Sequence, residues 1–312
     1  MTKKYLLLLA PFAALFLPAL VPTPAWSGSA KTATPDLDRI LTGDFTDAAR
    51  PPDSLHIVDW NIDRGERLDQ VAKVLDRDQP DLCLLQEVDL GAHRSGNLNV
   101  ADELAKRLKM RYAFGLAWQE LSQGDRERPS FQGQAILTRL PVRNVRVVRF
   151  KTQSGFWQPR SYVPNVPLFQ RRLGGRMAVV AELDFGGRTL VVYNVHLESR
   201  SFGHIQDAQM DEILADAKRY PESTPIILAG DFNTKYNAGS LGAKLRAAGW
   251  RSAFGSRAPR THTIMFSLDW IVARGPLRIE QGKVERGSGG SDHLPISATV
   301  SIAGSSASGS ED

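Results

Sequence analysis

The sequence contains very little cysteine. Cys83 is the only cysteine among the 312 residues, so the chain cannot form an intramolecular disulfide or a metal site with several cysteine ligands. Hydrophobic residues make up 42% of the chain and charged residues 23%, which is typical of a globular protein and not of a disordered or fibrous one. There is no fixed-period repeat and no linker rich in proline or glycine, so we expect one large domain and not two small ones.

Acidic residues are absent from one long stretch, residues 128–181. Those 54 residues contain ten lysines and arginines, whereas the whole chain has a formal net charge of +5, so the remaining residues sum to −5. A basic segment within an otherwise acidic chain predicts an anionic partner.

Two parts of this basic segment differ in character. Arg143, Arg146 and Arg149 lie on a strand-like stretch and either contact substrate or cover an exposed strand face. Residues 152–175 form a predicted long loop that mixes aromatic residues with arginines. This loop suits nucleic acid or a membrane surface, or it is a packed loop that covers the core. Its candidate substrate-binding residues are Trp157 and Arg172.

The chain also lacks a long uninterrupted apolar run. The apolar residues 5–21 are preceded by Lys3 and Lys4, are interrupted by two prolines and are followed by small residues. This pattern predicts a cleaved secretory signal over residues 1–30, and the alternative is a retained membrane anchor. We therefore expect a secreted or periplasmic protein. The predicted organisation is completed by a polar lead-in at 31–53, a catalytic domain at 54–303 and a disordered tail at 304–312.

The hydrophobic pattern between these ends predicts many strands and few helices. Predicted strands occupy residues 55–63, 81–88, 111–120, 133–140, 142–151, 176–185, 188–198, 224–233, 267–275 and 293–302. Predicted helices occupy residues 66–79, 99–110 and 203–219. Because the helices fall between groups of strands, we expect an α/β (α+β) fold with a sheet-on-sheet core covered by helices.

Several of the predicted buried strands end in polar residues of one chemical type. These residues are Asn61, Asp63, Glu87, Asn194, His196, Glu198, Asp231 and Asn233. Any one of them could be a turn former, but together they indicate side chains that converge on a ligand at the carboxyl ends of strands. Carboxylates suit a hard cation such as Mg²⁺ or Mn²⁺, and histidines suit proton transfer, so the chemistry of a phosphoester hydrolase is predicted.

The order and spacing of seven short motifs resemble those of the endonuclease/exonuclease/phosphatase superfamily. The motifs are WNI (60–62), LQEV (85–88), GQAILTR (133–139), NVHLE (194–198), GDFN (230–233), LDWI (268–271) and SDHLPI (291–296). The resemblance covers about residues 55–302. It implies the deoxyribonuclease I-like fold, a four-layered αββα sandwich of two packed mixed sheets, and hydrolysis of a phosphoester with a divalent metal, Mg²⁺ or Mn²⁺.

The resemblance also implies a role for each matching residue. Metal-site roles fall to Glu87, Asp63 and Asp292, with Asn61 beside the metal and phosphate. Catalytic roles fall to His293, to Asp269 as the carboxylate that orients it, and to Asp231, Asn233 and His196. Asn194 is expected to help stabilise negative charge on the substrate. The general base is left open between Asp231 and the pair of His293 and Asp269.

Two positions depart from the family pattern. Gln134 stands where many members have asparagine. The carboxylate that would support His196 has no clear match, and Glu120, Glu127 and Glu198 are candidates.

The leading hypothesis for function is a secreted or periplasmic nuclease. The alternative is a lipid phosphodiesterase or phosphatase of the same superfamily, similar to a sphingomyelinase or a phosphoinositide phosphatase. A non-catalytic binding module is disfavoured by the complete residue set. The expected partner is an anionic phosphoester, either nucleic acid or a membrane lipid, and no protein partner is implied.

Overall fold

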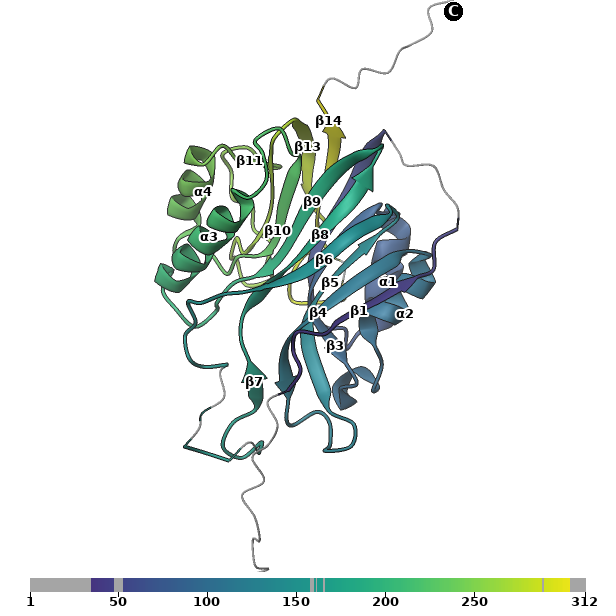
Figure 1. Ribbon diagram of the computed structural model, residues 1–312, viewed down its shortest axis with the longest axis vertical. Coiled ribbons are helices and arrows are strands. Elements are labelled where there is room, and N and C mark those ends of the chain that lie inside the picture. Colours follow the sequence, from purple (N-terminus) through teal and green to yellow (C-terminus); the bar gives the residue numbers. More distant parts are fainter. Residues whose placement is uncertain are drawn as a thin grey trace, which may run out of the picture. The chain divides into compact units, whose positions relative to one another are not determined.

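Two mixed β-sheets lie face to face in the computed structural model, with helices on their outer sides (Figure 1). The structure describes residues 35–47, 53–157, 160, 162–164, 166–287 and 289–303. The first sheet has eight strands. Their order is β1 (Ile40–Asp44), β4 (Arg111–Glu120), β5 (Ser130–Thr138), β3 (Leu82–Leu90), β2 (Ser54–Arg64), β14 (Ile296–Ile302) and β13 (Leu277–Val284), and β7 (Arg172–Gly174) pairs with β4.

The second sheet has six strands. Their order is β11 (Arg251–Ser252), β12 (Asp269–Arg274), β10 (Ile226–Asp231), β9 (Arg188–His196), β8 (Met177–Phe185) and β6 (Val142–Arg149). The helices are α1 (Leu68–Asp78), α2 (Val100–Leu108), α3 (His204–Ala217) and α4 (Ala238–Ala247), and a short 3₁₀ turn, η1, covers His93–Ser95. No helix among these described elements is long and apolar enough to cross a membrane.

Alternate residues of the central strands contribute to different apolar layers. In β2, Leu55 and Ile57 belong to the core between the two sheets, whereas Val58 and Trp60 belong to a second core with α1 and α2. A third core joins the outer face of the second sheet to α3 and α4. Because side chains alternate across a strand and both faces are covered, these strands carry continuous hydrophobic sequences. The predicted four-layered αββα sandwich is confirmed.

Most of the predicted elements are found within a few residues of their expected bounds, but the expected lead-in is partly wrong. Residues 40–44 form β1, which pairs antiparallel with β4 at the edge of the first sheet, and Leu41 packs against the core. The helix α4 was not predicted because Gly239 and Gly242 interrupt its apolar pattern. The predicted signal at 1–30 and the predicted tail at 304–312 lie outside the described residues.

Gly230 permits the close pairing of β9 and β10 immediately before Asp231. Its φ is 143°, and a Cβ atom there would lie 1.9 Å from the carbonyl oxygen of Val195. Substitution would therefore push apart the two strands that carry His196 and Asp231.

We expect Gly230→Ala to lower the free energy of unfolding by at least ~3 kcal/mol, measured by urea denaturation, because the clash is with backbone. Gly187→Ala is the matched control, since Gly187 also has a positive φ, 81°, but open space around it. This control should cost only ~1–2 kcal/mol. If both variants lost the same free energy of unfolding, the clash with the carbonyl oxygen of Val195 would not be the cause of the destabilisation.

Candidate functional site

The layer between the two sheets changes from apolar to polar at one end. In β10, Ile227 and Ala229 belong to the inter-sheet core, and Asp231 is the next residue on that face. In β9, Val192 belongs to the same core, and His196 lies further along the same face. Because side chains on one strand face recur every second residue, the polar ends of both strands point between the sheets.

A β-bulge places Glu87 at this polar end. The pairing of β3 with β5 shifts register between Leu85 and Val88, and Glu87 has a left-handed backbone with φ 51°. Bulges of this kind redirect side chains. Asp63 and Asn233 also have positive φ values, 46° and 52°. Such conformations cost free energy in residues other than glycine and cluster at functional sites.

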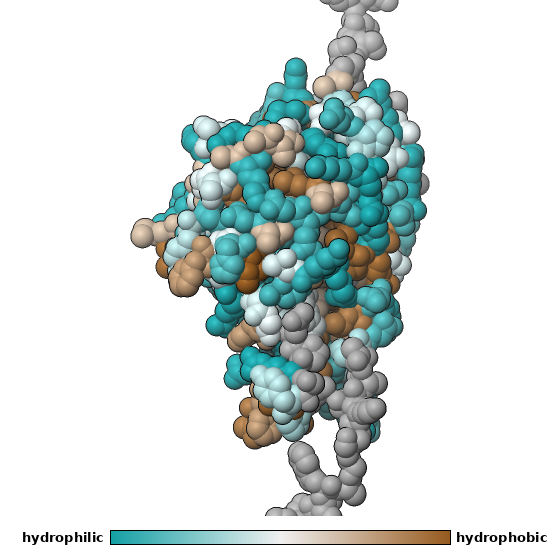
Figure 2. All heavy atoms as spheres, turned by 60° about the vertical axis from the view of Figure 1, so that its left-hand side comes forward, coloured by the Kyte–Doolittle hydropathy of each residue, from teal (hydrophilic) through white to brown (hydrophobic). Residues whose placement is uncertain are grey.

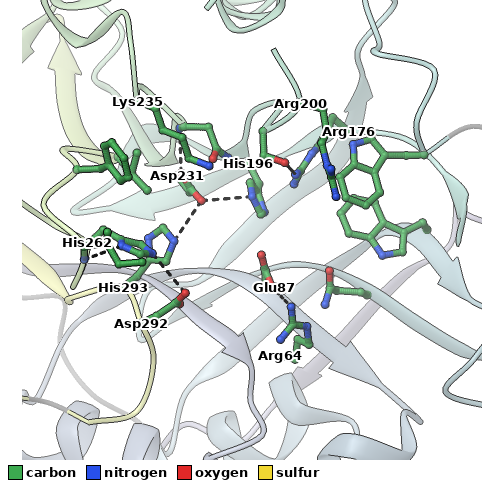
Figure 3. A pocket seen from close by; sticks show the side chains of 18 of the residues that line it. Arg64, Glu87, Arg176, His196, Arg200, Asp231, Lys235, His262, Asp292 and His293 are labelled. Carbon is green, nitrogen blue, oxygen red and sulfur yellow. Dashed lines mark hydrogen bonds and ion pairs between the residues drawn. The ribbon is translucent and has the colours of Figure 1, made fainter. Parts of the chain in front are cut away.

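A cavity of about 390 Å³ lies between the polar ends of the two sheets (Figure 3). Among the residues predicted from sequence, the cavity lining includes Glu87, Trp157, Arg172, His196, Asp231, Asn233, Asp292 and His293. The lining also includes several residues that were not singled out from sequence, namely Arg64, Arg176, Arg200, Lys235 and His262.

His293 and Asp269 form a buried pair at one side of the cavity. The Nδ1 atom of His293 lies 2.9 Å from both carboxylate oxygens of Asp269, and its Nε2 lies 3.7 Å from Oδ2 of Asp231. Burial opposes protonation of the imidazole, but the negative charges of Asp269 and Asp231 prevail and raise the pKa of His293 to about 10. His293 is therefore an imidazolium at neutral pH, oriented by Asp269.

Asp231 is the centre of the hydrogen-bond network. Its Oδ2 lies 3.3 Å from Nε2 of His196 and accepts from Nδ2 of Asn61 at 3.2 Å, and its Oδ1 accepts from the backbone N–H of Asn233 at 2.9 Å. Burial raises the pKa of Asp231 to about 6, although the charge of His293 opposes this shift. A carboxylate with a pKa near neutral is suited to accept a proton from water.

His196 has the opposite protonation preference to His293. Burial, together with the positive charges of Arg176 and His293, holds the pKa of His196 well below 6.5. At pH 7, His196 is therefore uncharged and His293 is positively charged. Neither Glu120 nor Glu198 supports His196, because Glu120 pairs with Arg172 and Glu198 accepts from the indole of Trp157.

His262 orients Asp292 and does not form a metal site with it. Its Nδ1 accepts the backbone N–H of Ile264 at 3.1 Å, so the ring proton is on Nε2, which lies 3.3 Å from Oδ2 of Asp292. His262, Asp292 and His293 are close enough to share an ion, but this tautomer leaves His262 without a lone pair for it. The edge of the His262 ring also packs against His293, with ring centroids 4.8 Å apart.

Asn194 does not reach the cavity. It is fully buried, its Nδ2 donates to the backbone carbonyls of Leu85 and Ala135 at 3.0 and 2.9 Å, and its Oδ1 accepts from Gln86 at 2.9 Å. These bonds join the two sheets beneath the site. The predicted substrate contact is therefore corrected to a structural one, because the amide is fully buried, is not part of the cavity lining and uses both N–H bonds within the fold.

The loop after β6 contributes Trp157 and β7 contributes Arg172 to the far wall of the cavity. The indoles of Trp157 and Trp118 stack with ring centroids 4.7 Å apart, and the guanidinium of Arg172 lies 4.9 Å from the Trp157 ring. Trp157 is only 4% exposed, so it is part of the packed wall and cannot insert into a membrane. Gln134, the departure from the family motif, is also buried, and it donates to the backbone carbonyl of Met177.

The three arginines of β6 serve the fold. Arg143, Arg146 and Arg149 form ion pairs with Asp184, Asp216 and Asp38, respectively. They therefore join β6 to neighbouring elements, which favours the structural alternative for these three arginines over contact with substrate.

The family model for the endonuclease/exonuclease/phosphatase family matches residues 60–293. The chain belongs to this family. Members of the endonuclease/exonuclease/phosphatase family are hydrolytic phosphoesterases, and the chain is an enzyme of this class. No curated protein matches the chain.

Solved structures of this family have the same fold. An endonuclease/exonuclease/phosphatase from Beutenbergia cavernae is 18% identical, with a TM-score of 0.61 over 81% of this chain and 72% of that one. The human Nocturnin catalytic domain with bound sulfate anion is 20% identical, with a TM-score of 0.60 over 84% and 97% of the two chains. TDP2 from C. elegans is 19% identical, with a TM-score of 0.54 over 80% and 75%.

Enzymes of the endonuclease/exonuclease/phosphatase family generally use a divalent metal, and the cavity contains oxygen donors that fit one. Glu87 makes only weak contacts, 3.4 Å to Asn61 and 3.7 Å to Arg64, and Asp292 keeps much of its carboxylate exposed. Carboxylate oxygens with free lone pairs suit a hard cation. We infer that Glu87 and Asp292 would hold it, with Asn61 beside Glu87.

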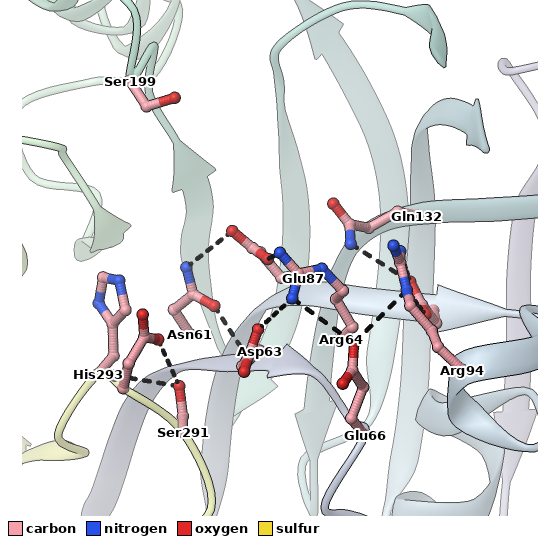
Figure 4. A network of polar contacts seen from close by, with 12 residues as sticks. Asn61, Asp63, Arg64, Glu66, Glu87, Arg94, Gln132, Ser199, Ser291 and His293 are labelled. Atoms are coloured by element: carbon pink, nitrogen blue, oxygen red, sulfur yellow. Dashed lines mark hydrogen bonds and ion pairs between the residues drawn. The ribbon is translucent and has the colours of Figure 1, made fainter. Parts of the chain in front are cut away.

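Asp63 is not among the residues that line the cavity. Its carboxylate is 2.5 Å from Nη1 of Arg64, whose side chain lies between Asp63 and Glu87 (Figure 4). The guanidinium of Arg64 thus occupies the space between the two carboxylates, where an ion shared by Asp63 and Glu87 would have to lie. The metal-ligand role predicted for Asp63 is not supported by this arrangement.

The charged state of His293 predicts how stability depends on pH. Because its pKa rises from 6.5 to about 10 on folding, His293 contributes stability that is complete below pH 6.5 and is lost as the pH rises toward 10. We expect the stability advantage of the native protein over His293→Gln, measured by urea denaturation, to shrink between pH 7 and pH 10. Asp269→Asn should weaken this pH dependence. A difference that stays constant over that range would contradict the assignment of an imidazolium.

Proposed function

We propose that the protein is an exported, divalent-metal-dependent phosphodiesterase that hydrolyses nucleic acids. The observation that carries this proposal is the unpaired positive charge in the cavity. Among the described residues, no carboxylate forms an ion pair with Arg176, Arg200 or Lys235, although all three line the cavity. A substrate with several phosphates would supply the missing negative charge.

The geometry suits in-line attack on a phosphodiester. Asp231 takes a proton from the attacking water, because its pKa is near 6 and it lies within the hydrogen-bond network. His293, held as an imidazolium by Asp269, stabilises or protonates the departing oxygen. A divalent cation at Glu87 and Asp292 would supply Lewis-acid polarisation of the phosphate.

Two exposed aromatic side chains, on loops that supply cavity residues, are consistent with binding of nucleic-acid bases. Phe202 and Tyr236 are 82% and 65% exposed and lie 5.4 Å apart between ring centroids. They follow Arg200 and Lys235 closely in sequence, so stacking surfaces and phosphate-binding cations come from the same two loops. Single-stranded nucleic acid is commonly bound by this combination.

A lipid substrate is the second candidate, and one specific observation favours it. Most of the large hydrophobic residues that are exposed lie on loops that also supply cavity residues; they are Phe156, Tyr162, Leu168, Phe169, Phe202, Tyr236, Ile264 and Met265. On the face shown in Figure 2, hydrophobic atoms form separate patches among hydrophilic ones. We favour nucleic acid because Arg176, Arg200 and Lys235 line the cavity itself and form no ion pair with a described carboxylate.

The proposal is tested with a panel of plasmid DNA, RNA, sphingomyelin and phosphoinositides, each with Mg²⁺, Mn²⁺ or EDTA. We expect metal-dependent cleavage of nucleic acid, and a loss of about 10²–10⁴-fold in kcat in His293→Ala. His204→Ala is the matched control, because His204 is exposed at the start of α3 and is not a cavity residue. Equal activity of His293→Ala and the native protein would reject the catalytic assignment.

Salt separates the two candidates. With three unpaired cations, the logarithm of nucleic-acid affinity should fall against the logarithm of salt concentration with a slope of about −2 to −3. Lipid hydrolysis would instead require an aggregated substrate and would fall when Phe202 and Tyr236 are replaced by alanine. Hydrolysis of lipids but not of DNA or RNA would replace the nuclease proposal by the lipid one.

Export is proposed from the N-terminal residues 1–30, whose charged start and apolar run are typical of a secretory signal. Expressed in a bacterium, the full chain should appear in the periplasm or medium with a shortened N-terminus by mass spectrometry. Recovery of the chain in the cytoplasm with its apolar run intact would contradict export.

A further inference from the structure

Arg176 is a buried cation whose hydrogen-bonding capacity is mostly unused. It directly precedes β8, is 3% exposed and lines the cavity. Its Nη2 donates to Oγ of Ser199 at 3.1 Å, whereas Nε and Nη1 have no hydrogen-bond partner in the described part of the chain. Since a buried charge without partners is costly, the position calls for a ligand or another specific explanation.

The surroundings hold this guanidinium in place without satisfying it. Its Cζ lies 5.1 and 4.8 Å from the ring centroids of the stacked Trp118 and Trp157. Both indole N–H groups are themselves anchored, on Glu120 and Glu198. Contact with aromatic faces favours a cation but provides no acceptor for its N–H groups. The side chain is thus held in one place, with two nitrogens that have no acceptor in the described part of the chain.

The position of Arg176 separates it from the groups that act on the cleaved bond. In Figure 3, Arg176 and Arg200 lie on the other side of His196 from His293. In the same view Asp231 and His293, which would act on the phosphate being hydrolysed, lie to the left of His196, and Glu87 lies below it. Arg200 also has no carboxylate partner among the described residues, and its guanidinium lies 4.3 Å from the ring of Phe156.

We propose that Arg176, with Arg200 beside it, forms a second anion subsite that binds a phosphate of the substrate other than the one being hydrolysed. The proposal rests on the nucleic-acid function proposed above, where this group is the neighbouring or terminal phosphate. The subsite would select substrates with at least two phosphates over simple phosphodiesters. An arginine suits this task because its planar guanidinium makes charge-assisted hydrogen bonds to phosphate oxygens.

The direct test is calorimetric titration of the metal-free protein, in EDTA, with inorganic phosphate and pyrophosphate. Arg176→Gln should weaken binding by about 10-fold or more, whereas Arg143→Gln should leave it within about threefold, since Arg143 pairs with Asp184 outside the cavity. Arg176→Lys should restore part of the affinity, because it keeps the charge with fewer donors. Unchanged binding in a folded Arg176→Gln variant would overturn the subsite.

The kinetic test uses dinucleotides with one internal phosphodiester and a free, 5′-phosphorylated or 3′-phosphorylated end. One terminal phosphate should raise kcat/KM of the native enzyme by about 10–100-fold. In Arg176→Gln this advantage should disappear while the unphosphorylated dinucleotide is cleaved nearly as before. Arg143→Gln is the matched control, since Arg143 pairs with Asp184 outside the cavity, and it should keep the advantage.

The outcomes distinguish this subsite from the proposed function and from a structural role. Equal losses for all dinucleotides in Arg176→Gln, or no preference in the native enzyme, would reject a second phosphate site. If the native enzyme cleaves no nucleic acid but phosphate binding still depends on Arg176, the nuclease proposal fails and the subsite stands. Thermal unfolding separates both from misfolding: Arg176→Gln should unfold no more easily than the native protein, because a poorly paired buried charge has been removed.

Discussion

The site depends on the hydrogen bonds that hold the two sheets together beneath it. Gln86 of the first sheet donates to Asn194 of the second, and Asn194 in turn donates to the backbone of β3 and β5. A buried amide left without partners would cost about 1–3 kcal/mol, so the sheets are constrained to one separation and one register at this end. Only with that spacing can His293 of the loop before β14 face Asp231 of β10.

Electrostatic asymmetry follows from this packing. His196 and His293 both lie close to Asp231 in a buried environment, yet only His293 has a second carboxylate, Asp269, at its other ring nitrogen. Burial therefore prevails at His196 and charge pairing prevails at His293. Two identical side chains thus become a neutral hydrogen-bond partner and a cation, which is the division of roles that phosphoester hydrolysis needs around a developing negative charge.

Sequence reasoning was most successful where a residue's role follows from strand alternation. Asp231 and His196 recur in step with the apolar residues of the inter-sheet face, so their convergence could be predicted. The same alternation placed Asn194 on that face. It could not show that the two sheets are still in contact at Asn194 and that the cavity begins only beyond it, at His196. Glu87 lies out of step with Leu84 and Gln86, and only the bulge with its positive φ brings it to the cavity. The family motif identified it, whereas periodicity alone would have placed it on the helix side.

The roles of individual arginines could not be predicted from the sequence, because they depend on contacts with residues that are distant in the chain. Ten basic residues between 128 and 181 look alike in the sequence. Arg146 forms an ion pair with Asp216, whereas Arg176 packs on two tryptophans and forms no ion pair with a carboxylate among the described residues. The difference lies in which side chains the fold brings near each arginine, and those partners are tens of residues away. Net charge over a segment therefore indicates that an anion is expected. Which cation binds it depends on where the protein has used its own carboxylates. Glu120 forms an ion pair with Arg172, whereas Arg176, which packs on the same two tryptophans, forms none with the described carboxylates.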